Sequence, residues 1–457
     1  MNLRLIIATM VICLAAGLPH SNAQQAIVAG NTTAGNTTAD ATSKRLTLSL
    51  RQAQDYAIEH NYTLTNASLD YQKAEAAKWQ ALSSMLPQVS LGFDYQNMMG
   101  YEMNFGVMNI PLNPNGTFTA TASVALTGQQ VVSVILADVS RQMSDITRRQ
   151  TIQSTEANVK NVYVSILVMQ ETMTLLDSSL ANIEHLSRTT QNAVAVGAAE
   201  QVDADKLTVQ VGTMRNTISS NRRALQMLQN SLLLQLGANP DDEITLTSKL
   251  DDILDITAAN QMLYKGFDID KNFDYQNLLL SEKASKEQML LAWMEFLPTL
   301  SAYYSYNSKT YFGKEEGMNM TPPNMIGASL KWSIFQSGSR AAKIKQAKID
   351  YNKFMNSKQQ AEDGLNVQYR QTAYDLVNAL ETYDTQKKNI GVSRRVFANI
   401  TEKFKYGRAS SLEVTQASND LITAQSSYIQ AVVSVVSAQV ALESLLCENQ
   451  YRETEQK

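Results

Sequence analysis

The stretch that decides the fold is Pro87–Gln96, PQVSLGFDYQ. After the proline, apolar and polar residues alternate with a period of two, which predicts a β-strand with one apolar face made of Val89, Leu91, Phe93 and Tyr95. Residues 118–127, 299–307 and 326–334 alternate in the same way. Four such strands of about nine residues are typical of transmembrane β-barrels, although ordinary soluble sheets alternate too.

These strands form two matched hairpins because the sequence is duplicated. Residues 61–96 align with residues 272–307 at an offset of 211, so that Leu86-Pro87 falls on Leu297-Pro298. Farther along, Val196-Gly197 followed by Asp203 aligns with Tyr406-Gly407 followed by Glu413 at an offset of 210. A period this long indicates duplication of a whole half-protein and not a solenoid repeat.

The duplication predicts the domain organisation. The first repeat spans 45–240, with a β-hairpin at 88–127 and a helical hairpin at 129–237. The second spans 272–447, with a β-hairpin at 299–334 and a helical hairpin at 336–446. Residues 241–271 join the repeats, and residues 448–457 form a C-terminal tail.

Long helices are predicted where proline is absent, at 115–239 and 324–457. Residues 129–196 lack glycine as well, and a helix of that length would be roughly 100 Å long. Apolar residues along it alternate three and four apart, as in a coiled-coil seam: Val159, Val162, Ile166, Met169, Met173, Leu176, Leu180 and Ile183. Helical hairpins turning at residues 196–197 and 406–407 follow from this pattern, and a soluble coiled-coil stalk would explain them equally well.

The N-terminus predicts export. Residues 1–23 combine Arg4, an apolar run and a small-residue end at Ser21-Asn22-Ala23, which is the pattern of a cleaved signal peptide. Residues 24–44 are polar and repetitive, so we expect a flexible leader.

Composition excludes several classes of function. The net charge is −4 with no basic block, which argues against nucleic acid as a partner. Two cysteines and three histidines leave little material for a metal site, a disulfide framework or histidine catalysis, and we expect His60 and His185 to be structural. We therefore expect no enzymatic activity, no cofactor and no metal site.

The strands impose a physical requirement on the assembly. A four-stranded sheet in hydrocarbon leaves two edges of unpaired backbone groups, each costing several kcal/mol, so one chain cannot span a membrane alone. The smallest bacterial barrels have about eight strands, which requires at least two copies. The polar strand faces would then line a lumen, and the assembly would be a conduit.

The chain resembles the TolC-like outer-membrane efflux protein family, over about Leu46 to Cys447. The resemblance rests on the duplicated plan, the Leu-Pro before each first strand, the Gly-then-acid turns and the Trp332-Ser333-Ile334-Phe335 exit from the last strand. It implies a mainly α fold with a transmembrane β part: a homotrimeric twelve-stranded β-barrel in the outer membrane of a Gram-negative cell, continued by an α-helical periplasmic tunnel.

The same resemblance implies partners and site residues. The partners are a periplasmic adaptor (membrane fusion protein), an inner-membrane transporter that supplies the energy, and outer-membrane lipid. The helical hairpin tips are the implied adaptor contacts, although glycine also suits such turns on backbone grounds alone: Val196, Gly197, Tyr406 and Gly407.

A periplasmic gate is implied near Asp203 and Glu413, where threefold symmetry would turn each acid into a ring and Arg408 would supply a charge pair. The family often has a second acid where this chain has Gln416, while Asp205 lies in the first copy. The alternative is that acids at a helix start simply interact with the helix dipole.

Methionines cluster in the strand loops, and thioethers bind soft ions such as Cu(I). We weigh copper or silver export against plain loop packing by these residues: Met98, Met99, Met103, Met108, Met318, Met320 and Met325. The predicted function is passive export, as the outer-membrane channel of a tripartite efflux or secretion system. An exported coiled-coil scaffold without a pore is the alternative.

Overall fold

The computed structural model describes residues 44–104, 106, 109–312 and 322–447. The predicted signal peptide, the leader up to residue 43 and the C-terminal tail lie outside this part of the chain. The described residues from Arg45 onward form one compact unit, and the fold described below belongs to it.

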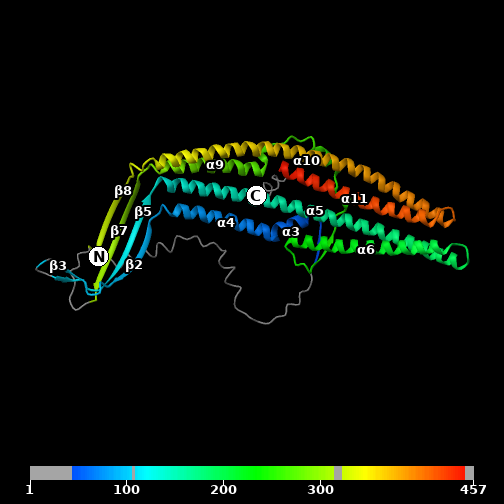
Figure 1. Cartoon of the computed structure of the whole chain (residues 1–457), viewed down its shortest axis with the longest axis horizontal. Helices are drawn as coiled ribbons and strands as arrows, with labels where there is room; N and C mark the ends of the chain where they lie inside the picture. The colour runs from blue at the N-terminus through cyan, green and yellow to red at the C-terminus, as the bar shows by residue number, and fades with distance from the viewer. Residues whose placement is uncertain (1–43, 105, 107–108, 313–321, 448–457) are drawn as a thin grey trace. The chain divides into compact units, whose positions relative to one another are not determined.

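A four-stranded antiparallel sheet joins the two repeats (Figure 1). Its order is β2 (Gln88–Gln96), β5 (Asn115–Leu126), β7 (Thr299–Tyr311) and β8 (Asn324–Lys331). The two hairpins therefore meet along β5 and β7. A separate small hairpin of β3 (Glu102–Asn104) and β4 (Asn109–Pro111) lies in the connection between β2 and β5.

The register puts the apolar residues of all four strands on one face. Val89 lies opposite Ala122, which lies opposite Tyr304, which lies opposite Ile326. Across the other face, the Thr119 hydroxyl donates to the Asn307 side-chain oxygen at 3.0 Å, and the hydroxyls of Ser301 and Ser329 lie 2.8 Å apart. The sheet is amphipathic as a whole, because the alternation in each strand is in phase with that of its neighbours.

The last strand is shorter than the sequence predicts. Alternation continues to Ile334, but β8 ends at Lys331. The Trp332 indole N–H donates to the Phe296 carbonyl oxygen at 3.0 Å, which ties this residue to the turn before β7. The predicted strand to residue 334 is therefore wrong by three residues, because a tertiary hydrogen bond redirects the chain.

Long helices continue from the sheet (Figure 1). The helix α4 (Tyr62–Ser83) leads into β2 and α5 (Gly128–Ala195) leaves β5, while α9 (Phe273–Met294) leads into β7 and α10 (Ser339–Lys405) leaves β8. The helices α6 (Gln201–Leu236) and α11 (Ser411–Leu446) return from the far ends of α5 and α10. The mainly helical fold that the sequence predicts is confirmed.

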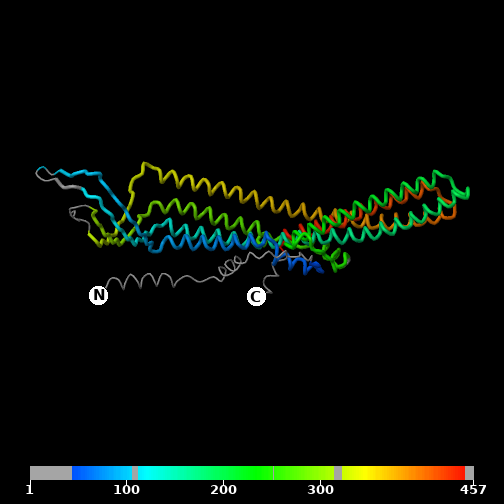
Figure 2. Tube along the Cα trace, turned by 90° about the horizontal axis from the view of Figure 1, so that it is seen from below, coloured from blue at the N-terminus to red at the C-terminus, as the bar shows by residue number. Residues whose placement is uncertain are grey.

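The two helical hairpins pack on each other in the half of the molecule away from the sheet (Figure 2). One cluster buries Met173 and Ile183 of α5 with Met214 of α6, Phe397 of α10 and Leu421 of α11. The predicted seam positions of α5 are buried or partly buried in this packing. Among the described helices, α11 is the one that is long and apolar enough to cross a bilayer, but half of its most apolar stretch is buried in the protein.

The same asparagine joint closes each repeat. Asn61 caps α4 by accepting from the Thr63 and Leu64 amides, and its own amide donates to the Gln235 carbonyl oxygen at 2.6 Å. Asn272 caps α9, and its amide donates to the Leu445 carbonyl oxygen at 3.3 Å. Each joint fixes the end of a returning helix against the start of a helix that leads to the sheet.

The segment between the repeats has structure that sequence patterns miss. Its strand β6 (Glu243–Leu246) pairs in parallel with β1 (Arg45–Leu48), which precedes α3 (Leu50–His60). The short helices α7 (Leu250–Ile253) and α8 (Ile256–Met262) pack on the long helices, and a 3₁₀ turn η1 (Ile269–Lys271) precedes α9. The Tyr163 hydroxyl of α5 donates to the Leu48 carbonyl oxygen at 3.0 Å and holds β1 in place.

Candidate functional site

The tips of the two helical hairpins are built alike. Gly197 and Gly407 have φ values of 74° and 67°, which L-residues with side chains rarely adopt, so glycine permits each turn. The residues before them, Val196 and Tyr406, are 79% and 71% exposed. Both turns lie at the end of the helices away from the sheet (Figure 1). Each tip thus presents a large apolar side chain to solvent.

The two acidic residues predicted for the gate, Asp203 and Glu413, contact different partners. The Ser411 hydroxyl of α11 donates a hydrogen bond to the Asp203 carboxylate of α6, which links the two hairpins. Glu413 instead belongs to the capping box of α11, where the Ser410 amide donates to its carboxylate at 2.6 Å. The hydrogen bonds from Ser410 hold the pKa of Glu413 below its usual value. The structure therefore brings Asp203 to a serine and not to Arg408.

The other polar residues considered for the gate, Gln416, Asp205 and Arg408, make contacts within their own helix or turn. The Gln416 amide donates to Asp420 at 2.8 Å in α11, and the Gln201 amide donates to Asp205 at 2.8 Å in α6. The Arg408 backbone N–H donates to the Lys403 carbonyl oxygen at 2.9 Å, as part of the hairpin turn. In one chain these residues form no common cluster with Asp203.

A second polar link lies one heptad farther along the same pair of helices. The Gln210 amide of α6 donates to the Ser418 hydroxyl at 3.2 Å and to the Asn419 side-chain oxygen at 3.1 Å. Gln210 and Ser418 are buried. We call the set Asp203, Gln210, Ser411, Ser418 and Asn419 the α6–α11 seam.

Sequence reasoning missed the seam beyond Asp203. The seven-residue spacing of Asp203 and Gln210 could have indicated it, because the apolar Leu207 and Met214 beside them mark the buried face of α6. The choice of partners on α11 could not be read from spacing within either helix.

Ion pairs stabilise the helical wall nearer the sheet. Lys78 of α4 lies 2.8 Å from Asp138 of α5, and its hydrogen bond lowers the pKa of Asp138 from 3.8 to about 2. Lys160 of α5 lies 3.0 Å from Glu443 of α11, with both side chains largely buried. These ion pairs connect neighbouring helices. They are suited to making the helical part of the molecule rigid, and less suited to a reactive site.

Within the described residues there is no cluster of three or more histidine, cysteine or acidic side chains that could hold a metal ion. Of the predicted methionine set, Met108, Met318 and Met320 lie outside the described residues. Met99 is 91% exposed and Met325 lies in β8. The ring of His60 stacks on Tyr56 with the centroids 4.1 Å apart.

The chain belongs to the outer membrane efflux protein family, whose profile matches residues 54–238 and 269–448, that is, both repeats. It is 22% identical over 424 residues to the outer membrane protein TolC of Escherichia coli (strain K12), a match that covers 87% of this chain and 82% of TolC. The resemblance drawn from the sequence is thereby confirmed.

Solved structures share the fold. VceC of Vibrio cholerae superposes with a TM-score of 0.69 at 14% identity, covering 87% of this chain and 95% of VceC. The CmeC outer membrane channel of Campylobacter jejuni gives a TM-score of 0.70 at 15% identity, covering 89% of this chain and 88% of CmeC. The chain is therefore an outer-membrane protein that acts in efflux, with the fold of outer-membrane channels.

Proposed function

We propose that three copies of this chain form one channel, in which a twelve-stranded barrel crosses the outer membrane and the helices continue it as a tunnel into the periplasm. The observation that carries the proposal is the open amphipathic sheet. Among the described residues, β2 and β8 lie at the two edges of the sheet, and each pairs with a single strand. In hydrocarbon their free edges require partners, and a closed barrel supplies them.

Strand direction supports closure by identical copies. The four strands alternate in direction from β2 to β8, so β8 of one copy runs antiparallel to β2 of the next. Every copy therefore extends the sheet without a change of pairing type, as in bacterial barrels of even strand number. Three copies, the number that the resemblance to TolC-like channels implies, give twelve strands.

The two faces of the sheet suit lipid and lumen. The apolar face includes exposed side chains on both edge strands, among them Leu91 on β2 and both Ile326 and Leu330 on β8. The opposite face presents hydroxyl and amide groups such as Thr119 and Asn307. The apolar face would contact lipid, and the polar face would line a water-filled passage for substrates that move without a covalent step.

The α6–α11 seam is the candidate gate at the periplasmic end. Its hydrogen bonds join the two helical hairpins close to their tips, and water can replace such bonds at a net cost of about 1–3 kcal/mol each. Separation of the hairpins along this seam would widen the entrance. We assign the exposed tips, with Val196 and Tyr406, to contact with a periplasmic adaptor that passes substrate from an inner-membrane pump.

Conductance of the full chain in planar bilayers tests this function. We expect Asp203→Ala and Ser411→Ala each to raise single-channel conductance, because either change breaks the seam. The matched control is Asp205→Ala, because Asp205 lies on the same helix and its carboxylate accepts from Gln201 of that helix at 2.8 Å. A protein that is monomeric and soluble without detergent, with no conductance, would instead indicate the exported scaffold.

A further inference from the structure

The two repeats of one chain pack on each other through α5 and α11. These helices lie side by side, with α6 and α10 on the outer sides of the pair (Figure 1). Val164 and Val168 of α5 are buried in one cluster with valines of α11, among them Val432 and Val436. The first repeat therefore contacts the second through an apolar face of each helix.

The equivalent faces of the outer helices are uncovered in the single chain. At the repeat offset of 210, the buried face of α5 corresponds to a face of α10, and that of α11 corresponds to a face of α6. The α10 face consists of Val367, Arg370, Tyr374 and Asn378, and the α6 face consists of Arg222, Gln226 and Asn230. All of these residues are exposed, Val367 and Tyr374 to 65% and 67%. Each face thus lacks the helix that covers its counterpart.

The order of the strands indicates what covers the α10 face. Within the chain, β5 of the first repeat pairs with β7 of the second. In the proposed channel, β8 of the second repeat pairs with β2 of the next copy, so the two kinds of repeat alternate around the ring. The same alternation places α10 of one copy against α6 of the next copy, as α5 lies against α11 within the chain.

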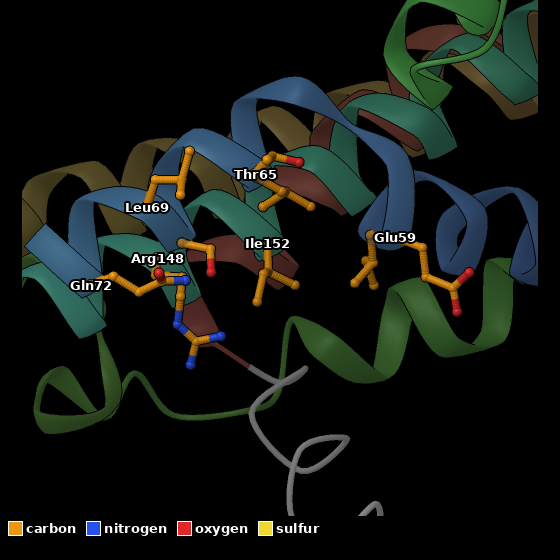
Figure 3. Close-up of a pocket in the computed structure, with 9 residues that line it drawn as sticks. Glu59, Thr65, Leu69, Gln72, Arg148 and Ile152 are labelled. Carbon is orange, nitrogen blue, oxygen red and sulfur yellow. The ribbon is translucent and has the colours of Figure 1, made fainter. Parts of the chain in front are cut away.

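The start of α4 shows the same difference between the repeats. Tyr62 and Leu69 of α4 correspond to Phe273 and Leu280 of α9 at the offset of 211. The two α9 residues pack in one cluster with Ile146 of α5. Their α4 counterparts are exposed, and Leu69 borders an open pocket of about 340 Å³ between α3, α4 and α5 (Figure 3). The α10 helix of a neighbouring copy would cover this side of α4 in the way that α5 covers α9.

The charges at one end of the two faces are complementary. Glu381 is exposed one turn beyond Asn378, on the same side of α10. The helix α10 runs away from the sheet and α6 returns toward it, so the Glu381 end of one face meets the Arg222 end of the other. An ion pair of Glu381 with Arg222 would then join two copies, as the ion pair of Lys160 joins α5 to α11 within the chain.

We propose that the α10 face docks on the α6 face of the next copy, so that the contact between copies repeats the contact between the two halves of one chain. This contact rests on the three-copy channel proposed above and names the helix surfaces through which the copies associate. Tyr374 packs against Gln226, and Glu381 pairs with Arg222. Because the contact joins two different faces, every copy uses both of them, and the copies close into a ring.

Disulfide trapping in the full-length chain tests this contact. The pair Tyr374→Cys and Gln226→Cys is made in a Cys447→Gly background, glycine being the residue at the equivalent position of the first repeat, Gly237. The control pairs Tyr374→Cys with Ala224→Cys, because Ala224 is exposed on the opposite side of α6 from Gln226. We expect at least about tenfold more covalent trimer for the Gln226 pair, because the Cβ atoms of a disulfide lie only about 4 Å apart.

The Cys447→Gly parent distinguishes failure of this contact from failure of the channel. If the parent forms an SDS-resistant trimer but the two pairs give equal yields of covalent trimer, the assigned faces are wrong and the channel remains. Disulfides that join Tyr374→Cys to a different protein would assign the α10 face to that protein and would equally overturn the contact. A parent that is monomeric in outer-membrane fractions would refute both proposals.

Reversal of the ion pair gives a second measurement without cysteines. Arg222→Glu and Glu381→Arg should each lower, by a few degrees, the temperature at which the SDS-resistant oligomer dissociates, and the double variant should recover it. The control is Arg223→Glu, because Arg223 donates to the Ser219 hydroxyl of its own helix at 2.8 Å. Combined with Glu381→Arg, it should give no recovery. Recovery in both double variants, or in neither, would contradict the pairing of Glu381 with Arg222.

Discussion

An arginine at the centre of the apolar sheet face tests the membrane assignment. Leu91 is the fourth of nine residues in β2, is 71% exposed in the single chain and lies on the face that also carries Val89 and Ile326. At the centre of its strand it would lie near the bilayer midplane. Arginine on the lipid face there costs about 2–4 kcal/mol in each chain, and about 6–12 kcal/mol in an assembly of three.

The neighbouring residue is the matched control. Ser90 lies on the polar face, opposite Thr121, and its replacement by arginine would meet water in the lumen. We expect Leu91→Arg to abolish the SDS-resistant, heat-modifiable oligomer in outer-membrane fractions and Ser90→Arg to retain it. Normal assembly of Leu91→Arg together with loss of assembly in Ser90→Arg would show that the faces are reversed. Equal assembly of both variants would refute the membrane assignment.

Further variants test the packing described above. Asp138→Asn should lower the melting temperature at pH 7 by a few degrees, equivalent to about 1–2 kcal/mol, and should have a much smaller effect at pH 2. The reason is that the pKa of Asp138 is lowered to about 2 in the folded protein. The ion pair therefore stabilises the fold fully above about pH 4, and this stabilisation is lost as the pH falls from about 4 through about 2. Lys160→Met should destabilise the protein by about 1–3 kcal/mol in thermal unfolding, because the carboxylate of Glu443 loses its cation. A similar loss of stability in a Glu443→Gln variant would confirm the ion pair. No loss of stability in either variant would exclude it. Gly237→Ala should reduce the folded yield sharply, because φ is 71° at this position and a Cβ would lie 2.2 Å from the His60 carbonyl oxygen. The equivalent change in the second repeat, Cys447→Gly, should shift stability by less than about 1 kcal/mol. Equal folded yields of the two variants would contradict the close contact of Gly237 with His60.

Local patterns were sufficient for much of the fold. Strand alternation predicted the faces of the sheet, because a half-buried strand requires period two and the register of antiparallel hairpins preserves it. The absence of proline predicted the long helices, and Gly197 and Gly407 marked their turns, since each adopts a positive φ. The duplication then transferred each assignment from one repeat to the other.

Tertiary contacts account for what the sequence did not predict. The parallel pair of β1 and β6 joins strands of four residues each that lie far apart in the chain, and strands this short carry no alternation signal. The end of β8 at Lys331 depends on the hydrogen bond from Trp332 to Phe296. The pairing of Asp203 with Ser411 depends on how α6 and α11 are rotated in their shared cluster, which spacing along one helix does not specify.

Electron cryomicroscopy of the full chain, extracted from outer membranes, tests the central claim most directly. The account predicts a threefold-symmetric particle in which β8 of each copy is hydrogen-bonded to β2 of the next and twelve strands enclose a lumen. A single copy whose four-stranded sheet has both edges covered by other parts of the same chain would contradict it.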